Sequence, residues 1–197
     1  MIYYLIPARK GSKTLPNKNH VLVPVTLKQL VNKPKSNIIL STDDEWLIEQ
    51  YKNTGIIVHK RSAVTASDTA SMKSVIAEVI NDIGVRPDDD IVVLYPTYIE
   101  RTDTDIDNVY SHYGIMGAVS ELCCYPCSEY MEMRIDSEPH GKYRRQDYDK
   151  VFIYSHYVAV IKAGILHLLD EQLRHKNTSY YKLNEKPRDV DCADGLL

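Results

Sequence analysis

The amino-acid sequence predicts one α/β domain, built as three layers around a Rossmann-like, mainly parallel sheet. Its 197 residues, of which 44% are hydrophobic, suit a single globular domain with a buried core. Short apolar runs alternate along the chain with segments of helical periodicity, which is the order of elements in α/β folds. The run at residues 90–95 is continuously apolar after its first residue, as expected of a parallel strand covered on both faces.

These patterns predict six strands and five helices. The first helix ends before Pro34, because a proline biases the preceding residue away from helical geometry. Thr42 or Asp43 can cap the second helix, and the oxygen-rich residues 68–71 can cap the third. The expected strands are residues 2–6, 37–41, 56–58, 90–95, 117–121 and 151–161, and the expected helices are residues 25–31, 46–55, 75–83, 103–113 and 163–173.

Composition excludes several classes of protein. A net charge of −3 and a pI near 6.2 argue against a general nucleic-acid binder, whose domain would be strongly basic. No apolar run approaches the roughly 20 residues of a membrane span, and the N-terminus lacks a secretory pattern, so we expect a cytoplasmic protein. Cys124 and Cys127 have a Cys-x-x-Cys spacing, but a structural zinc site needs about four ligands and no second pair exists. Reduced thiols are therefore expected.

A basic loop follows the first strand. Residues 9–18 contain one arginine, three lysines and no acidic residue, with Gly11 and Ser12 at the bend. Glycine lets the backbone approach an anion, while hydroxyl, N–H and cationic groups bind it. The loop lacks the Gly-Lys-Ser/Thr ending of a Walker loop and the spaced glycines of a dinucleotide fingerprint. From these residues alone it is either a phosphate-binding loop, placed where open α/β sheets have their sites, or a solvated basic turn.

The sequence Ile-Pro-Ala-Arg-x-Gly-Ser-Lys-x-Leu-Pro-x-Lys-Asn, at residues 6–19, resembles the signature of the acylneuraminate cytidylyltransferases, or CMP-sialic acid synthetases. Members of that family join CTP to an acidic sugar and release pyrophosphate. The resemblance implies a fold of the nucleotide-diphospho-sugar transferase type. It also implies that Arg9 and Lys18 act at the phosphates as catalytic residues and that Ser12 and Asn19 bind the nucleotide.

Two later segments also match that family. Arg61 and the Asp-Thr-Ala-Ser stretch that ends at Ser71 look like its nucleotide-binding segment, so the resemblance implies that both residues bind CTP. The stretch beginning at Tyr95 looks like the family's Gln-Pro-Thr-Ser-Pro-Leu-Arg-Thr. Here Tyr95 replaces the glutamine that reaches the sugar, and Tyr98 and Ile99 replace the Ser-Pro pair. The wall of the sugar site is therefore expected to be altered.

The resemblance assigns five further residues to the sugar or to a metal. Arg145 and Gln146 fall in a segment similar to the family's Arg-Arg-Gln-Asp-Leu-Pro, whose arginine faces the sugar acid. Ser155 replaces an asparagine that contacts the sugar. Asp189 and Asp191 look like the family's Asp-Ile-Asp, which binds catalytic Mg²⁺. Carboxylates at i and i+2 of an extended segment point the same way, as a shared Mg²⁺ requires.

His156 follows Ser155, at the place of a glycine in the family. It is either a new catalytic base or a structural histidine whose hydrogen bonds are satisfied, and the second is expected.

The resemblance implies a single domain over residues 1–197, with residues 122–149 as a shortened insertion through which a homodimer forms. The implied partners are CTP and a sialic-acid-like sugar acid. Three alternatives stay open. One is an enzyme of the deoxyoctulosonate type, against which the first loop argues. The others are a nucleotide-binding relative that has lost turnover and a structural or assembly protein that keeps the fold.

Overall fold

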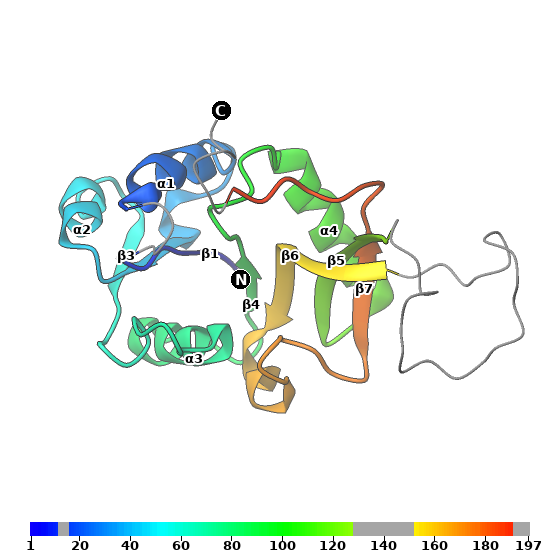
Figure 1. The fold of residues 1–197 in the computed structure, drawn as a ribbon. Coiled ribbons are helices and arrows are strands. Elements are labelled where there is room, and N and C mark those ends of the chain that lie inside the picture. The colour runs from blue at the N-terminus through cyan, green and yellow to red at the C-terminus, as the bar shows by residue number, and fades with distance from the viewer. Residues whose placement is uncertain (12–15, 128–151, 191–197) are drawn as a thin grey trace, which may run out of the picture.

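The computed structural model describes residues 1–11, 16–127 and 152–190 of the chain. In this part of the chain, seven strands form one sheet in the order β3-β2-β1-β4-β6-β5-β7 (Figure 1). The strands are β1 (Ile2–Pro7), β2 (Ile38–Thr42), β3 (Ile57–Lys60), β4 (Asp90–Val93), β5 (Ser120–Pro126), β6 (Phe152–Lys162) and β7 (Thr178–Lys182).

Most neighbouring strands of the sheet are parallel. β1 pairs in parallel with both β2 and β4, β2 pairs in parallel with β3, and β5 pairs in parallel with β7. β6 is the exception, because it runs antiparallel to β4 and to β5. The predicted α/β class with a mainly parallel, Rossmann-like sheet is therefore confirmed.

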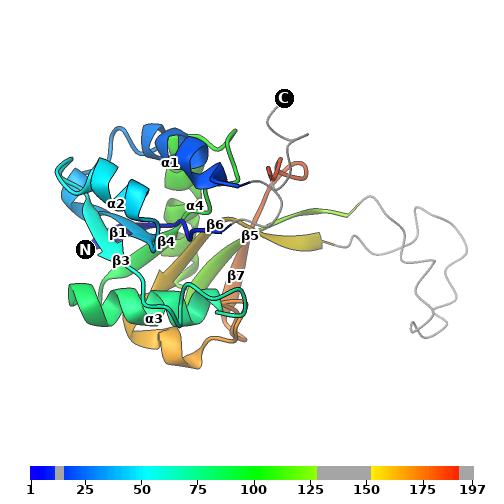
Figure 2. The same cartoon turned by 60° about the vertical axis from the view of Figure 1, so that its left-hand side comes forward.

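Helices cover both faces of the sheet and complete the three layers. α1, α2 and α4 lie on one face, and α3 lies on the other together with the short helix η4 (Figure 2). The helices are α1 (Lys18–Lys28), η1 (Lys35–Asn37), α2 (Glu45–Tyr51), α3 (Met72–Ile83), α4 (Asp103–Met116) and η4 (Ala163–Leu168), of which η1 and η4 are 3-10 helices. None of the described helices is long and apolar enough to span a bilayer.

Alternate side chains of β1 enter two separate cores. Tyr4 and Ile6 belong to the cluster beneath α1, α2 and α4, whereas Leu5 belongs to the cluster beneath α3 and η4. Each fully buried aliphatic side chain contributes about 1.5–3 kcal/mol, so β1 is fixed from both sides. Its carboxyl end, where the basic loop begins, is therefore held rigidly.

The first helix differs from the prediction. It was expected at residues 25–31, but α1 begins at Lys18, directly after the loop, and contains Pro24. An interior proline costs a helix about 3 kcal/mol. Burial of Leu22 and Val23 offsets this, since each fully buried aliphatic side chain contributes about 1.5–3 kcal/mol. The basic loop therefore runs straight into a helix N-terminus.

The cap of the second helix also differs. Asp44, rather than Thr42 or Asp43, caps α2, because its Oδ1 accepts from the backbone N–H of Trp46 at 2.9 Å. The Thr42 hydroxyl instead accepts from the N–H of Asp44 at 3.0 Å and thereby positions the cap.

The helix expected at residues 163–173 is wrong beyond its first turns. η4 is a 3-10 helix that ends at Leu168, and the backbone N–H groups of Ala163 and Gly164 at its start donate to Asp89 and Pro87, each at 2.9 Å. A Cβ on Gly164 would lie 2.9 Å from Pro87, so glycine allows this close approach. β7 follows and was not predicted, because the sequence Thr-Ser-Tyr-Tyr-Lys is too polar to read as a buried strand.

Candidate active site

A cavity of about 340 Å³ opens at the carboxyl ends of β1 and β4. The chain leaves β1 toward α1 on one face and reaches β4 through α3 on the other, so the two connections diverge at this point. Open α/β sheets bind ligands where the strand order diverges in this way. Six predicted site residues line the cavity together: Arg9, Lys18, Asn19, Arg61, Tyr95 and Asp189.

The basic loop supplies one wall of the cavity. The Asn19 side-chain amide donates to the carbonyl oxygen of Arg9 at 2.8 Å, which ties the start of α1 to the loop. The Arg9 guanidinium makes an ion pair with Asp68 at 2.6 Å, and both side chains are partly exposed. Because α1 begins at Lys18, which lines the cavity together with Asn19, the helix N-terminus lies at the cavity, and a helix N-terminus favours anions.

Arg61 is the buried cation of the site. Its Nε donates to Ser41 Oγ at 3.0 Å, and its backbone N–H donates to the carbonyl oxygen of Thr42 at 3.0 Å. Its Nη2 is buried and has no hydrogen-bond partner among the described residues. A buried donor without a partner costs about 1–3 kcal/mol, and more when it is charged, so a ligand acceptor here would restore the lost hydrogen bond. Burial lowers the pKa of Arg61 to about 10, against the opposing effect of Asp43 and Glu78, so the group stays cationic at neutral pH.

Aromatic side chains form the opposite wall. Tyr95 lies with its ring centroid 5.3 Å from that of His156, and the two ring planes are tilted by 31°. Tyr98 also lines the cavity, and burial raises the pKa of its hydroxyl to about 12. Tyr95, Tyr98 and His156 thus give this wall its aromatic character.

His156 differs from the prediction of a satisfied structural histidine. Its Nδ1 is buried without a hydrogen-bond partner in the described part of the chain, and the side chain lines the cavity. Burial lowers the pKa of His156, opposed by a hydrogen bond with Gln172. The imidazole is therefore biased toward its neutral form.

Two predicted residues lie outside the cavity lining. Ser71 is the N-cap of α3, where its hydroxyl accepts from the N–H of Ser74 at 3.1 Å, and its neighbour Met72 reaches the cavity instead. Ser155 is buried behind Tyr98, with the two hydroxyl oxygens 3.1 Å apart. Both serines therefore support residues of the site rather than line it.

The segment after β7 brings Asp189 to the cavity. In Figure 1 this segment, drawn in red, runs back toward α1. The N–H of Val190 donates to the carbonyl oxygen of Thr97 at 3.0 Å, and the Val190 side chain is fully buried. This anchor sets a carboxylate beside the cationic wall, and hard oxygen ligands of this kind suit Mg²⁺.

The remaining predicted residues lie outside the described residues. They are Ser12, Arg145, Gln146 and Asp191, together with residues 128–149 of the expected insertion. The first part of that insertion, Leu122 to Pro126, belongs to β5. Of the thiols, Cys123, Cys124 and Cys127 form no disulfide in the described part of the chain.

Two positioning residues of the site were missed. Arg101 is 2% exposed, and its guanidinium donates to Gln29 Oε1 and to the carbonyl oxygens of Tyr95 and Tyr157. The Gln29 amide donates in turn to the carbonyl oxygen of Tyr98 at 3.0 Å. Together they fix the backbone of the aromatic wall. The family motif at residues 95–102 contains Arg101, but the resemblance assigned it no role. Gln29 directly follows α1, and no pattern in the sequence marked it as a site residue.

Solved structures of three other proteins share this fold. One is CMP:2-keto-3-deoxy-manno-octonic acid synthetase complexed with CTP, at 16% identity and a TM-score of 0.73, covering 99% of this chain and 95% of that one. Another is 4-diphosphocytidyl-2C-methyl-D-erythritol synthase, at 12% identity and a TM-score of 0.63, covering 96% and 90%. The third is a putative glucose-1-phosphate thymidylyltransferase from Bacillus anthracis in complex with sucrose, at 10% identity and a TM-score of 0.62, covering 100% and 92%.

At such identities these likenesses establish the fold alone. A family model described as cytidylyltransferase, however, matches residues 3–121, which is more than half of the chain. The matched residues include the basic loop, Arg61, Tyr95 and Tyr98. The chain therefore belongs to the cytidylyltransferase family.

Proposed function

We propose that this cytidylyltransferase joins CTP to a sialic-acid-like, nonulosonic sugar acid and gives a CMP-sugar and pyrophosphate. The nucleotide half of the proposal rests on the buried guanidinium of Arg61, whose Nη2 has no hydrogen-bond partner among the described residues. Arg61 lines the same cavity as Arg9 and Lys18. Three cations around one cavity suit a triphosphate, which carries several negative charges.

The proposed reaction is an in-line displacement at the α-phosphorus of CTP. The anomeric hydroxyl oxygen of the sugar forms the new bond to that phosphorus, the bond to the bridging oxygen breaks, and pyrophosphate leaves. Arg9 and Lys18 stabilise the charge that develops on the phosphoryl oxygens, while Asn19 holds the loop in place through the Arg9 carbonyl. These residues act by position and charge, without covalent chemistry.

Asp189 fits a role as a ligand of Mg²⁺, with Asp191 as its predicted second ligand. The carboxylate lies on the cavity wall that faces the cationic loop, and carboxylate together with phosphate oxygens is the usual environment of this ion. When bound, Mg²⁺ would neutralise charge on the phosphates.

The acceptor half of the proposal rests on the aromatic wall and on the segment at residues 145–146. Tyr95, Tyr98 and His156 line the cavity, and Arg145 and Gln146 stay predicted contacts of the sugar carboxylate. An arginine suits that task because its planar fork holds a carboxylate bidentately. The CMP:2-keto-3-deoxy-manno-octonic acid synthetase with the same fold makes deoxyoctulosonate the second acceptor to test, although the basic loop follows the sialate pattern.

Pyrophosphate release, measured with CTP, Mg²⁺ and a panel of nonulosonic acids plus deoxyoctulosonate, tests the proposal. Release with a nonulosonic acid is expected, and Arg61→Ala should abolish it while the protein stays folded. The control is Lys52→Ala, which removes an exposed cation, paired with Glu49, that lies outside the cavity lining. Release only with deoxyoctulosonate would overturn the acceptor. CTP binding without release from any acid would favour a nucleotide-binding relative that has lost turnover.

We further propose that the chain forms a homodimer through residues 122–149 and the adjoining strand ends. Phe152, Ile153, Tyr154 and Tyr180 are each at least 36% exposed at that end of the sheet, which is unusual for large apolar side chains. Light scattering should give a dimer for the wild type and a monomer for Ile153→Glu. A monomeric wild type would contradict this proposal.

A further inference from the structure

Arg61 is held in place through its Nε. The Nε–H bond lies in the plane of the guanidinium group, so the hydrogen bond to Ser41 Oγ at 3.0 Å fixes the orientation of that plane. The orientation of the plane in turn decides where Nη2, the atom without a partner in the described residues, points. Ser41 is fully buried, so its position is itself fixed by the sheet.

Ser41 is linked to a histidine on the neighbouring strand. Ser41 of β2 and His59 of β3 are directly opposite in the parallel register, and Ser41 Oγ lies 3.0 Å from His59 Nδ1. Both residues are buried. Because an arginine cannot accept a hydrogen bond, Ser41 Oγ accepts from Arg61, and its own hydrogen is free to be donated to His59 Nδ1 when that nitrogen carries no proton.

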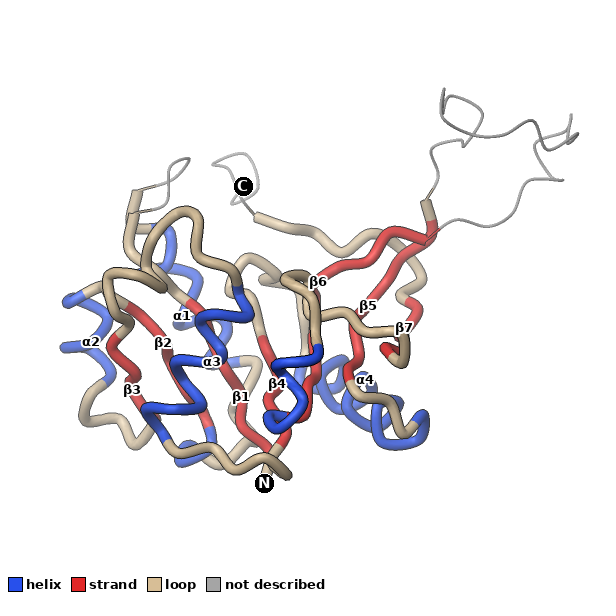
Figure 3. Tube along the Cα trace, turned by 90° about the horizontal axis from the view of Figure 1, so that it is seen from below, coloured by secondary structure: helices blue, strands red, loops and turns tan. Residues whose placement is uncertain are grey.

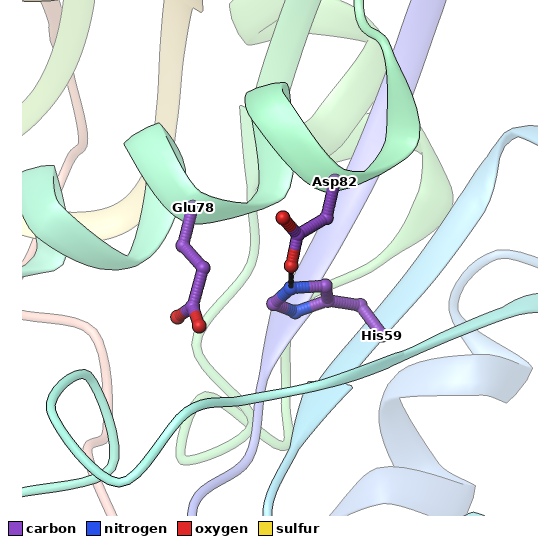
Figure 4. Close-up of side chains that lie close together, drawn as sticks. All are labelled: His59, Glu78 and Asp82. Carbon is purple, nitrogen blue, oxygen red and sulfur yellow. Dashed lines mark hydrogen bonds and ion pairs between the residues drawn. The ribbon is translucent and has the colours of Figure 1, made fainter.

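The chain of hydrogen bonds ends on a carboxylate of α3. His59 Nε2 lies 3.1 Å from Asp82 Oδ2, and Figure 4 shows the Asp82 carboxylate against the His59 ring. A carboxylate only accepts, so neutral His59 donates from Nε2 and receives at Nδ1. The His59 side chain is 3% exposed and that of Asp82 is 55% exposed, so the chain runs from the protein surface to the cavity.

The same helix also fixes the backbone that follows Arg61. Glu78, one turn before Asp82 on α3, accepts from the N–H of Ser62 at 2.8 Å and from the Thr65 hydroxyl. In Figure 3, α3 lies across the face of β1, β2 and β3. α3 therefore holds Arg61 in two ways. Asp82 acts on the Arg61 side chain through His59 and Ser41, and Glu78 holds the turn that follows Arg61.

We propose that Ser41, His59 and Asp82 form a hydrogen-bonded relay that positions Arg61 for the nucleotide, so that a half-exposed carboxylate on α3 sets the affinity for CTP. This rests on the proposed function only in taking CTP as the ligand of the cavity. Within it, Ser41, His59 and Asp82 are positioning residues, and Arg61 is the residue that meets the ligand.

A metal ion is the competing explanation of these side chains. Ligand atoms of His59, Glu78 and Asp82 lie within 4.8 Å of one another, as a metal site would need. Each of the three side chains, however, already has hydrogen-bond partners: His59 in Ser41 and Asp82, and Glu78 in Ser62 and Thr65. The relay accounts for the contacts of His59 and Asp82, and Glu78 is held by the turn after Arg61, so none of these contacts needs an ion.

Calorimetric titration of CTP in the presence of Mg²⁺ tests the relay. Ser41→Ala should weaken CTP binding about tenfold and Asp82→Ala about threefold, with the KM for the acceptor unchanged. In an Arg61→Lys background, which keeps the charge but loses the guanidinium plane, Asp82→Ala should change the affinity no further. The control is Glu45→Gln, which removes the exposed partner of Lys60 next to His59 and should leave CTP binding unchanged.

Three results would overturn the relay. One is wild-type affinity in both Ser41→Ala and Asp82→Ala. Another is a loss of affinity on Asp82→Ala that is as large in the Arg61→Lys background as in the wild type. The third is a rise in melting temperature with Zn²⁺ alone that Glu78→Gln abolishes, which would make the cluster a metal site. The relay predicts no effect of Zn²⁺.

A measurement without nucleotide separates failure of the relay from failure of the proposed function. Nitrogen NMR of His59 at mildly alkaline pH should find the proton on Nε2 in the wild type and a mixture of tautomers in Ser41→Ala. A proton on Nδ1 in the wild type would overturn the direction of the relay. Absence of CTP binding by the folded wild type, with the Nε2 tautomer intact, would instead overturn the assignment of CTP to the cavity.

Discussion

The Tyr98 hydroxyl lies 3.1 Å from Ser155 Oγ, and both groups are buried. Ser155 was expected to contact the sugar. It instead holds Tyr98, and Tyr98 lines the cavity. Tyr98→Phe removes this hydrogen bond and keeps the ring. We expect the KM for the acceptor to rise severalfold while the affinity for CTP is unchanged, because a net hydrogen bond is worth about 0.5–1.5 kcal/mol. Steady-state kinetics with each substrate varied in turn measures this, and a change confined to CTP would contradict it.

Removing the partner of Arg9 should strengthen nucleotide binding. Asp68 pairs with Arg9 at 2.6 Å on the rim of the cavity and competes there with phosphate oxygens. Asp68→Asn should tighten CTP binding up to about fivefold, which corresponds to the roughly 1 kcal/mol of a good exposed ion pair. Titration calorimetry measures the change, with Glu49→Gln in the exposed pair with Lys52 as the control. Weaker binding in Asp68→Asn would mean that Asp68 itself contacts the nucleotide.

Loss of the Arg101 guanidinium should destabilise the protein strongly. Arg101→Met leaves Gln29 Oε1 and the carbonyl oxygens of Tyr95 and Tyr157 without their donor. Breaking such a buried cluster costs about 3–5 kcal/mol. Urea unfolding should register this loss in the free energy of unfolding. The exposed Arg174→Met is the control and should change it by less than about 1 kcal/mol. A small effect of Arg101→Met would contradict the positioning role.

The Asp44 cap should make stability depend on pH in the acid range. Burial raises the pKa of Asp44, but hydrogen bonds from His20 and from the backbone N–H of Trp46 outweigh it and hold this pKa below its usual value. A depressed carboxyl pKa contributes stability that is fully present above the ordinary value, about 3.9, and is lost as the pH falls through the folded-state pKa.

The comparison of wild type with Asp44→Ala measures this contribution. Loss of an aspartate cap costs about 0.5–2 kcal/mol, so the variant should be less stable by that amount at neutral pH. The difference between the two proteins should shrink as the pH falls through the folded-state pKa of Asp44. Urea unfolding at several pH values supplies the numbers. A difference that is constant with pH would contradict a charged cap.

The sequence predicted the half of the site that depends on strand ends. Arg9 and Tyr95 follow buried strands, and parallel strands bring their carboxyl ends to one edge, so their meeting at one cavity follows from local pattern. Asp189 was found by resemblance, because nothing in its own segment predicts the anchor of Val190 on Thr97.

The differences between the structure and the sequence-based predictions came from competition between local and tertiary effects. Ser71 has the residue type of a ligand and of a cap, and the N–H groups at the start of α3 use it as a cap. By local preference Pro24 should precede the first helix. α1 instead contains it, because burial of Leu22 and Val23 offsets its cost. Ser155 lies in β6 outside the cavity lining, and its hydroxyl contacts that of Tyr98, which lines the cavity from the loop after β4.

The bond from Val190 to Thr97 joins parts of the chain that are synthesised at different times. A domain generally folds as one unit, so the cavity can be completed only after residue 190 has left the ribosome. Asp189 would therefore reach the cationic wall at the end of synthesis, and catalytic competence would arrive late in the life of the nascent chain.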